Sequence, residues 1–198
     1  MYKFLDLVRQ NGLVRKDINQ AISKLLDSAS FIGGAEISEF ENNFSNFIGV
    51  NSCIGVGNGT DALEICIEAL EFPPGSEIIV PVNSFIATSE AVLRSGHKII
   101  FADVLEKNAT IDPTSIREKI SRDTVAVIAV HLYGHPCSMQ EISEICEKNG
   151  LVLIEDCAQS HGACVNGKMV GSFCKVSAFS FYPGKNLGGI GDGGAILT

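Results

Sequence analysis

The 198-residue sequence predicts an α/β fold, in which a mostly parallel sheet is covered by helices on both faces. Apolar runs of strand length alternate with segments whose apolar residues recur at helical spacing, which is the pattern of parallel βαβ units. The runs are also continuously apolar, as over residues 125–130, and such runs are typical of strands that are buried on both faces.

The N-terminal 48 residues are expected to form a helical segment that precedes this sheet. Apolar residues recur at helical spacing over 15–26, which predicts a short amphipathic helix. A second helix is expected over 38–47, where Ser38 as N-cap and Glu41 three residues later resemble a capping box.

Strands and helices then alternate through a single large domain over residues 49–198. The expected strands cover residues 78–82, 98–102, 124–131, 151–155 and 176–181, and another begins at 195. The expected helices cover residues 60–70, 87–95, 113–120 and 139–149. Because residue 198 falls inside the last strand, we expect the large domain to be incomplete at its C-terminus and a C-terminal small domain to be absent.

The composition argues against several classes of partner. The formal net charge is -8 and Lys and Arg form no cluster, so we expect no binding to nucleic acid. The apolar runs are far shorter than the roughly 20 residues that a membrane-spanning helix needs. Charged residues interrupt 1–14 before a signal peptide can form. We therefore expect a cytoplasmic protein that crosses no membrane.

The cysteine and histidine patterns predict neither disulfides nor a metal site. The seven cysteines are an odd number without a C-x-x-C pair, which favours reduced structural thiols in a chain of this size. His131 and His135 are four residues apart, but Gly134 and Pro136 disfavour the helix that would direct both toward one zinc ion.

One lysine and one acid near the C-terminal end are the candidates for chemistry. Lys185 lies in a loop rich in Pro and Gly. A lysine amine attacks an aldehyde only when it is neutral, and burial or nearby positive charge lowers its pKa toward that state. Asp156 follows four apolar residues, where a carboxylate is costly unless it is paired. A protonated pyridine nitrogen is one such partner, which indicates a cofactor bound as an imine. An exposed loop lysine and an aspartate that caps the next segment are the plainer alternatives.

A glycine turn that opens a helix predicts a phosphate site. Gly59, Thr60 and Asp61 lie where free N–H groups and the positive end of the helix dipole suit a phosphate. Thr60 or Asp61 can equally be no more than an N-cap. Ser180, five residues before Lys185, can donate its hydroxyl to the same phosphate.

Two further residues are candidates for contact with a cofactor ring. Phe85 can stack on a flat ring, although phenylalanine is more often a core residue. Gln159, three residues after Asp156, can hydrogen-bond a phenolic oxygen. A dinucleotide is the weaker alternative. The turn before the helix at 60–70 lacks a third glycine, and the G-x-G-x-x-G sequence at 189–194 leads into a strand.

Taken in order, these motifs resemble the DegT-type sugar aminotransferases, vitamin B6 enzymes with the fold of aspartate aminotransferase (fold type I). The resemblance extends over nearly the whole chain. Its motifs are Phe-Ile-Gly-Gly at 31–34, the glycine turn at 57–63, His-Leu-Tyr-Gly at 131–134, Glu-Asp-Cys-Ala-Gln at 155–159, Phe-Ser-Phe at 179–181 and Gly-Lys-Asn at 184–186.

The resemblance implies a role for each candidate residue. Lys185 corresponds to the lysine that holds pyridoxal 5'-phosphate (PLP) and shuttles a proton. Asp156 corresponds to the partner of the pyridine nitrogen, Gln159 to the residue near the ring oxygen and Phe85 to the stacking residue. The residues that correspond to phosphate contacts are Thr60, Asp61 and Ser180.

It also implies the reaction. Family members transfer an amino group, usually from L-glutamate, to a keto sugar carried on a nucleotide, with pyridoxamine 5'-phosphate as intermediate and 2-oxoglutarate as the first product. A dTDP-3-keto-6-deoxyhexose is the expected substrate, and a homodimer the expected assembly. Relatives that dehydrate the sugar have histidine in place of Lys185. The alternatives are a non-catalytic or incomplete module of this fold, a family enzyme with another substrate, and a nicotinamide dehydrogenase.

Overall fold

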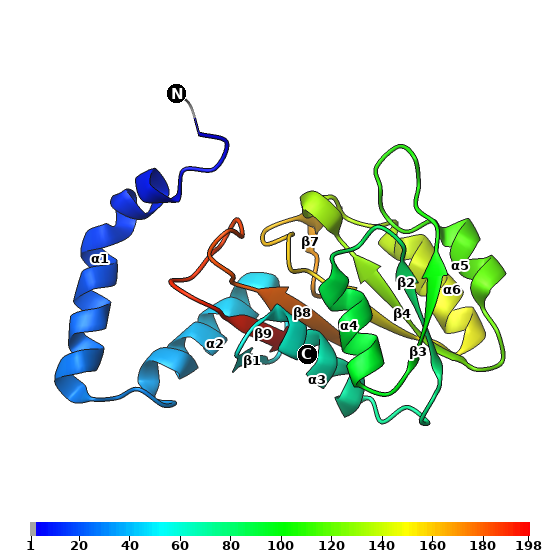
Figure 1. The fold of residues 1–198 in the computed structure, drawn as a ribbon, viewed down its shortest axis with the longest axis horizontal. Helices are drawn as coiled ribbons and strands as arrows, with labels where there is room; N and C mark the ends of the chain where they lie inside the picture. The colour runs from blue at the N-terminus through cyan, green and yellow to red at the C-terminus, as the bar shows by residue number, and fades with distance from the viewer. Residues whose placement is uncertain (1–2) are drawn as a thin grey trace.

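One seven-stranded sheet forms the centre of the molecule, and helices lie on both of its faces (Figure 1). The computed structural model describes residues 3–198. In spatial order the strands are β1 (Cys53–Val56), β9 (Gly194–Leu197), β8 (Val176–Ser180), β5 (Val152–Asp156), β4 (Thr124–Val130), β2 (Glu77–Pro81) and β3 (Lys98–Ala102). The helices are α1 (Leu7–Ser28), α2 (Ala35–Ile48), α3 (Gly59–Ala69), α4 (Ile86–Arg94), α5 (Pro113–Lys119), the 3-10 turn η1 (Leu132–Gly134) and α6 (Met139–Asn149). A separate hairpin consists of β6 (Cys164–Val165) and β7 (Lys168–Met169).

The sheet is mostly parallel, as the sequence predicts. Strands β3, β2, β4, β5 and β8 pair in parallel. Strand β9 runs antiparallel to both β8 and β1, so one end of the sheet is mixed. The parallel pairing places the carboxyl ends of β4, β5 and β8 side by side, and ligands of such sheets bind beyond these ends.

Three apolar clusters cover the two faces of the sheet, and the alternation along β2 shows how they divide. Ile78 and Val80 pack with residues of α3 and α4, whereas Ile79, between them, packs with residues of α5 and α6. A third cluster joins α2 to β8 and β9 through Phe44 and Phe179. Each of these fully buried side chains contributes about 1.5–3 kcal/mol of hydrophobic stabilisation.

Most element boundaries lie within one or two residues of the predicted ones. Helix α6 begins and ends where predicted, and Gly150 follows it in the left-handed conformation with φ 66°. Val82, His131 and Phe181 lie just beyond the strands in which they were expected, whereas Asp156 is the last residue of β5.

Two predictions about the N-terminal half are wrong, and both concern α2 and β1. Helix α2 begins at Ala35 with Gly34 as N-cap, so Ser38 lies inside the helix and forms no capping box. The Glu41 carboxylate instead accepts a hydrogen bond from the Gly55 N–H of β1, at 2.8 Å. Strand β1 is absent from the predicted strands, because an edge strand of four residues that contains a glycine gives little periodic signal.

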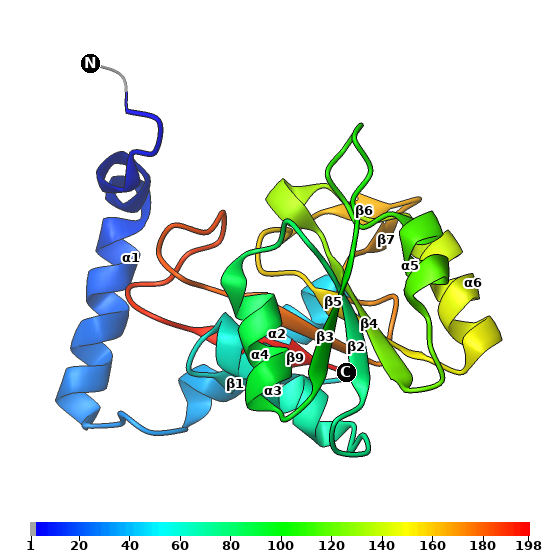
Figure 2. The ribbon, with the colours of Figure 1, turned by 45° about the vertical axis from the view of Figure 1, so that its right-hand side comes forward.

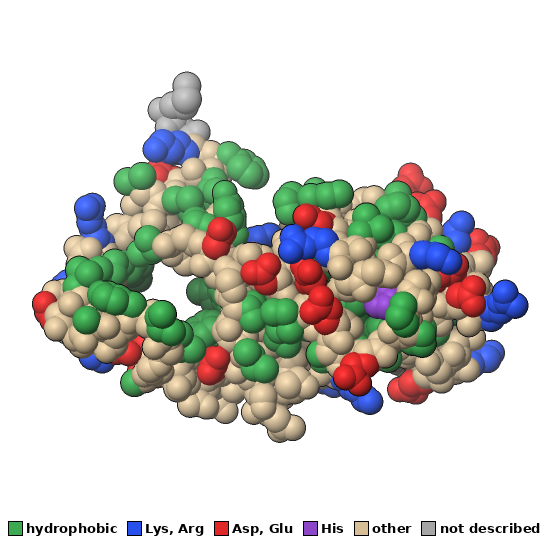
Figure 3. Space-filling model, turned by 60° about the horizontal axis from the view of Figure 1, so that its bottom comes forward, with side chains coloured by type: hydrophobic (Ala, Val, Ile, Leu, Met, Phe, Trp, Pro, Cys, Tyr) green, Lys and Arg blue, Asp and Glu red, His purple; other side chains and the backbone are tan. Residues whose placement is uncertain are grey.

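Helix α1 is longer than predicted and lies apart from the sheet (Figures 1 and 2). Asp6 caps it by accepting from the Arg9 N–H at 3.1 Å, and a Lys24–Glu36 ion pair of 2.7 Å links it to α2. None of residues 7–28 is buried, and Figure 3 shows apolar side chains on the surface of this arm. Within residues 3–198, no helix combines the length and apolar character that crossing a membrane requires. The division at residue 48 stays a prediction.

Candidate active site

A cavity of about 630 Å³ opens between the N-terminal ends of α3 and α4 and the loop that follows β8. All of the residues singled out from the sequence line it. They are Gly59, Thr60, Asp61, Phe85, Asp156, Gln159, Ser180 and Lys185. The fold thus brings together side chains from four separate parts of the sequence, and the role of each remains a prediction.

Asp156 lies at the floor of this cavity, at the carboxyl end of β5, and its carboxylate is held on both oxygens. Oδ2 accepts a hydrogen bond from the Thr88 hydroxyl at 2.8 Å, and Oδ1 accepts one from the Ala158 N–H at 3.1 Å. The Ser84 hydroxyl lies 2.7 Å from that of Thr88 and extends the chain of contacts. Burial raises the pKa of Asp156, and the two hydrogen bonds and the charge of Lys185 oppose that rise.

Lys185 is half-buried in the loop after β8, where its backbone N–H donates to the Tyr182 carbonyl at 2.8 Å. Burial lowers the pKa of its amine, while the Asp156 carboxylate acts in the opposite direction. The lowered pKa increases the fraction of neutral amine, which is the nucleophilic form. The site therefore pairs an amine activated by burial with a carboxylate fixed in direction.

His161 anchors the loop that carries Lys185. Its Nδ1 lies 2.8 Å from the Asn186 Oδ1, and the Asn186 side-chain amide donates to the His161 carbonyl at 2.9 Å. The ring packs against Phe179 and Phe181, each 5.3 Å away between centroids. Burial lowers the pKa of His161, which favours a neutral ring beside the lysine.

The first turn of α3 forms the other end of the cavity, and its N-cap is Asn58 rather than Thr60 or Asp61. Asn58 Oδ1 accepts from the Asp61 N–H at 2.9 Å, and its amide donates to the Asp61 carboxylate at 2.8 Å. The N–H groups of Gly59 and Thr60 precede the first intrahelical bond, which Ala62 makes to the Asn58 carbonyl. Gly59 and Thr60 line the cavity, so the positive end of the α3 dipole lies at the cavity wall.

Gly59 also sets how closely α3 approaches β8. A Cβ on Gly59 would lie 2.6 Å from the Cβ of Ser180, so no other residue fits there without movement. The glycine therefore brings the free N–H groups of α3 beside the Ser180 hydroxyl, as a phosphate site requires.

Gln159 and Phe85 both line the cavity and are available to contact a ligand. Gln159 Oε1 accepts from the Tyr133 N–H at 2.8 Å, which leaves the side-chain amide as a hydrogen-bond donor. Phe85 is 66% exposed and precedes α4 as its N-cap residue, so it is not part of the core. Tyr133 has φ 54°, a left-handed conformation that aims its N–H at Gln159.

Several functional contacts were not predicted from the sequence, for different reasons. Asparagine is a preferred N-cap residue, so the sequence Asn-Gly-Thr-Asp was sufficient to predict that Asn58 caps α3. Thr88 and Asp156 are 68 residues apart, so no local pattern joins them. The same holds for His161 and Asn186, which are 25 residues apart.

A buried cluster of His131, Glu155 and Cys157 has metal-ligand chemistry, since its potential ligand atoms lie within 4.8 Å of one another. Both oxygens of Glu155 already accept hydrogen bonds, among them one from the Gly171 N–H at 2.7 Å. Burial raises the pKa of the Cys157 thiol well above its usual value, which disfavours the thiolate that binds metals. The arrangement favours a hydrogen-bond network. All seven cysteines are free.

Comparison with known proteins identifies the family. Residues 13–198 match the sequence profile of the DegT/DnrJ/EryC1/StrS aminotransferase family. The chain belongs to this family. Close relatives and structural neighbours are PLP-dependent sugar aminotransferases.

Two curated relatives of this DegT-family chain show the range of substrates. The dTDP-3-amino-3,6-dideoxy-alpha-D-galactopyranose transaminase of Aneurinibacillus thermoaerophilus is 46% identical over 198 residues, which are 100% of this chain and 54% of the relative. The UDP-N-acetyl-3-dehydro-alpha-D-glucosamine 3-aminotransferase of Acidithiobacillus ferrooxidans is 44% identical over 194 residues, 98% of this chain and 53% of the relative. The chain thus spans about half the length of the curated relatives it matches.

Solved structures agree with the fold of the DegT-family chain. DesV of Streptomyces venezuelae, in complex with a ketimine intermediate, matches with a TM-score of 0.96 and 40% identity over 99% of this chain and 53% of that one. NtdA of Bacillus subtilis, with bound pyridoxamine phosphate, matches with a TM-score of 0.93 and 35% identity over 100% of this chain and 45% of that one.

The residues of the cavity fit the family's cofactor. Gly59 lets α3 approach β8 closely, which places two free N–H groups beside the Ser180 hydroxyl, and these are groups that can bind a phosphate. The Asp156 carboxyl is fixed in direction by Thr88 and Ala158 and can pair with a pyridinium nitrogen, and Gln159 keeps an amide donor that can reach a ring oxygen. Lys185 supplies an amine that burial makes more nucleophilic.

Proposed function

We propose that this chain binds PLP and transfers an amino group from L-glutamate to the keto group of a nucleotide-linked deoxysugar, as a cytoplasmic homodimer. A dTDP-3-keto-6-deoxyhexose is the substrate we favour. The observation that carries the proposal is the convergence of Asp156 and Lys185, from β5 and from the loop after β8, on one cavity.

Each residue has a stated part in this proposal. Lys185 would hold the cofactor through Nζ and would move protons at that atom. Asp156 keeps the ring nitrogen protonated, and Gln159 donates to the ring oxygen. Phe85 stacks on the ring. The phosphate contacts are Gly59, Thr60, Asp61 and Ser180.

The bound cofactor would supply an electron sink for the substrate carbon. The protein's part is to keep the Lys185 amine neutral between proton transfers and to orient the ring. Thr88 and Ala158 serve this purpose indirectly, because they fix the Asp156 carboxylate in one direction. Ser180 and α3 fix the other end of the cofactor.

The test is the visible absorbance of the purified chain with PLP, before and after addition of L-glutamate. We expect a band that requires Lys185 and that glutamate bleaches. Lys185→Ala should abolish the band, whereas Lys175→Ala, at an exposed lysine outside the cavity, should retain it. A band that persists in Lys185→Ala, or its absence from the unchanged chain, would count against the proposal.

The choice of sugar needs its own assay, since the relatives named above act on sugars carried by different nucleotides. The support for dTDP is the 46% identity to the dTDP-sugar transaminase. We expect the cofactor, once loaded with an amino group, to return to its aldehyde form with a dTDP-linked 3-keto-6-deoxyhexose and more slowly with UDP- or GDP-linked keto sugars. A faster reaction with the UDP-linked sugar would reassign the substrate.

A further inference from the structure

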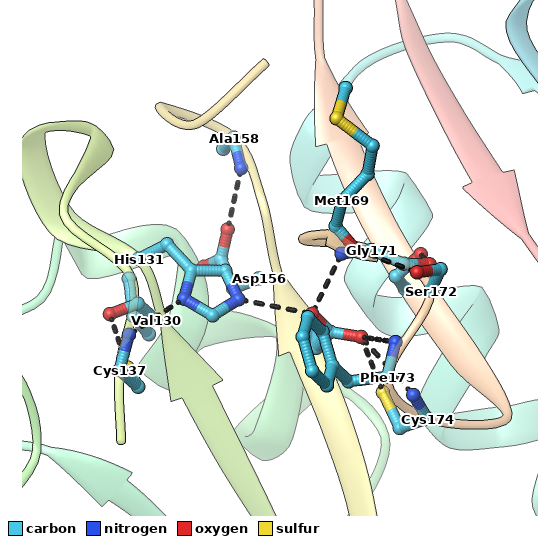
Figure 4. Close-up of polar contacts among 12 residues, drawn as sticks. Val130, His131, Cys137, Asp156, Ala158, Met169, Gly171, Ser172, Phe173 and Cys174 are labelled. Atoms are coloured by element: carbon cyan, nitrogen blue, oxygen red, sulfur yellow. Dashed lines mark hydrogen bonds and ion pairs between the residues drawn. The ribbon is translucent and has the colours of Figure 1, made fainter. Parts of the chain in front are cut away.

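Behind the cavity, His131 and Glu155 form a fully buried pair that the proposed reaction does not use. Figure 4 shows the His131 ring with Cys137 on one side, among the polar contacts that surround Asp156. The imidazole Nε2 lies 3.1 Å from the Glu155 carboxylate, and the other ring nitrogen, Nδ1, accepts from the Cys137 N–H at 3.1 Å. A backbone N–H can only donate, so Nδ1 carries no proton. His131 is therefore the neutral tautomer with its proton on Nε2, which it donates to Glu155.

The Glu155 carboxylate is saturated with donors besides His131. Its Oε2 accepts from the Gly171 N–H at 2.7 Å, and its Oε1 accepts from the N–H groups of Phe173 at 2.8 Å and Cys174 at 3.2 Å. Burial alone would raise the pKa of Glu155, but hydrogen bonds from His131, Gly171 and Cys174 outweigh it and hold the pKa below its usual value. The side chain is thus a buried carboxylate satisfied by hydrogen bonds, and it ties β5 to the segment after β7.

The pair connects directly to two cavity residues. Glu155 precedes Asp156 in β5, so the two side chains project to opposite faces of the sheet. The His131 N–H donates to the Asp156 carbonyl at 3.1 Å. The bond from Cys137 to the His131 ring also closes the turn over 131–137, in which Tyr133 presents its N–H to Gln159.

We propose that His131 and Glu155 are positioning residues that fix, from behind the cavity, the directions in which Asp156 and Gln159 face a bound cofactor ring. This inference rests on the proposed function for the identity of the ligand. The geometry of the pair does not depend on it.

The isosteric variant Glu155→Gln tests the inference. Each Glu155 oxygen accepts at least two hydrogen bonds, and in the variant an NH2 group, which can only donate, replaces one of these oxygens. The network must therefore rearrange, although the side-chain volume does not change. Ile142→Val is the matched control, since Ile142 is also fully buried but lies on α6, outside the network. His131→Gln serves if Glu155→Gln does not fold, because it keeps a donor for Glu155 and loses only the acceptor for Cys137.

The first readout needs no cofactor. The Ala158 N–H donates to the Asp156 carboxylate, so its hydrogen exchange reports whether that carboxylate keeps its direction. We expect Glu155→Gln to speed exchange at Ala158 at least tenfold, and Ile142→Val to leave it unchanged. Faster exchange at Gly171 and Cys174 with an unchanged rate at Ala158 would overturn the inference, because the pair would then only hold the neighbouring loop.

The second readout separates ring from phosphate recognition by calorimetry. In Glu155→Gln or His131→Gln we expect the affinity for pyridoxamine phosphate to fall about tenfold and that for inorganic phosphate to stay the same. Equal losses for both ligands would contradict a positioning role. If the unchanged chain binds no pyridoxamine phosphate, the proposed function fails, and the exchange rate at Ala158 still decides the role of the pair.

Discussion

Thr88 shows how much of this site depends on a single hydroxyl. Its Oγ1 donates to Asp156 at 2.8 Å, where both side chains are buried, and it contacts the Ser84 hydroxyl at 2.7 Å. A hydrogen bond to a charged group contributes about 1.5–3 kcal/mol. Without it, the buried carboxylate would lose one of the interactions that oppose its protonation.

Replacing Thr88 by valine should therefore weaken cofactor binding without a change in shape. We expect Thr88→Val to raise the pKa of Asp156 further and to reduce the affinity for pyridoxamine phosphate about tenfold, roughly 1.4 kcal/mol. Thr88→Ser keeps the hydroxyl and should bind as the unchanged chain does. Equal affinities for the valine and serine variants, measured by calorimetry, would show that the hydroxyl is not needed.

Asp156 should also make the cofactor-free chain less stable as the pH rises. Its folded pKa lies above its unfolded value of about 3.9. The folded state therefore binds more protons between these two values, so stability falls as the pH rises through that window. Asp156→Asn, which cannot ionise, should unfold at a higher temperature than the unchanged chain at neutral pH.

The difference should vanish at low pH. Each 1 kcal/mol gained corresponds to about 2–4 °C in a chain of this size. Thermal scans of both proteins from pH 3 to pH 8 provide the check, and a difference that does not grow with pH would contradict the assignment. The same variant should lose cofactor binding, as expected where function depends on a destabilised group.

Among single residues, the sequence allowed prediction of those that differ chemically from their neighbours in the chain. Asp156 and Lys185 could be found because an acid after an apolar strand and a lysine among glycines are unusual. Thr88 and His161 could not, because each is an ordinary residue in its local segment. Their importance arises only from contacts with Asp156 and Asn186 across the fold.

Among the elements, α3 and β8 depend on a close approach at one glycine. In Gly59→Ala the new Cβ would clash with Ser180, which should cost about 1–3 kcal/mol and move the free N–H groups away from the hydroxyl. We expect the midpoint of urea unfolding to fall and the affinity for inorganic phosphate to fall with it.

A second glycine-to-alanine change provides the comparison. Gly12 lies in α1 with nothing within 4 Å of an added Cβ. Gly12→Ala should favour the helix by about 0.5–1 kcal/mol locally and leave the urea midpoint unchanged. If Gly59→Ala leaves the urea midpoint unchanged, as Gly12→Ala should, the close approach of α3 to β8 does not limit stability.

The elements themselves were predictable where the local signals agree. Helix α6 was placed to the residue, because its apolar positions recur at helical spacing and Gly150 ends it. Strand β1 and the β6–β7 hairpin were missed, since segments of two to four residues carry almost no periodicity. Ser38 has the residue type of an N-cap, but α2 begins at Ala35 with Gly34 as its N-cap, so Ser38 lies inside the helix.

For the molecule as a whole, α1 is the part that the rest of the chain does not support. It has 22 residues and buries none of them, and helices in proteins owe most of their stability to packing. In the dilute chain we expect amides of residues 7–28 to exchange much faster than those of α3, by mass spectrometry. Protection of α1 equal to that of α3 at low micromolar concentration would contradict this expectation. Protection that appears only at higher concentration would indicate that a second copy covers it.

The pairing of β1 with β9 has a consequence for biosynthesis. The Ser52 N–H donates to the Thr198 carbonyl at 2.9 Å, and Gly194 packs closely on Asn58, so the end of the cavity at α3 joins segments that are far apart in the sequence. Contacts of such long sequence separation form late, because a large loop must close first. On the ribosome, β2, β3 and β4 can assemble while β9 is still inside the exit tunnel. A nascent chain therefore acquires a folded sheet before β9 joins it, so the proposed phosphate site forms later than the strands that surround it.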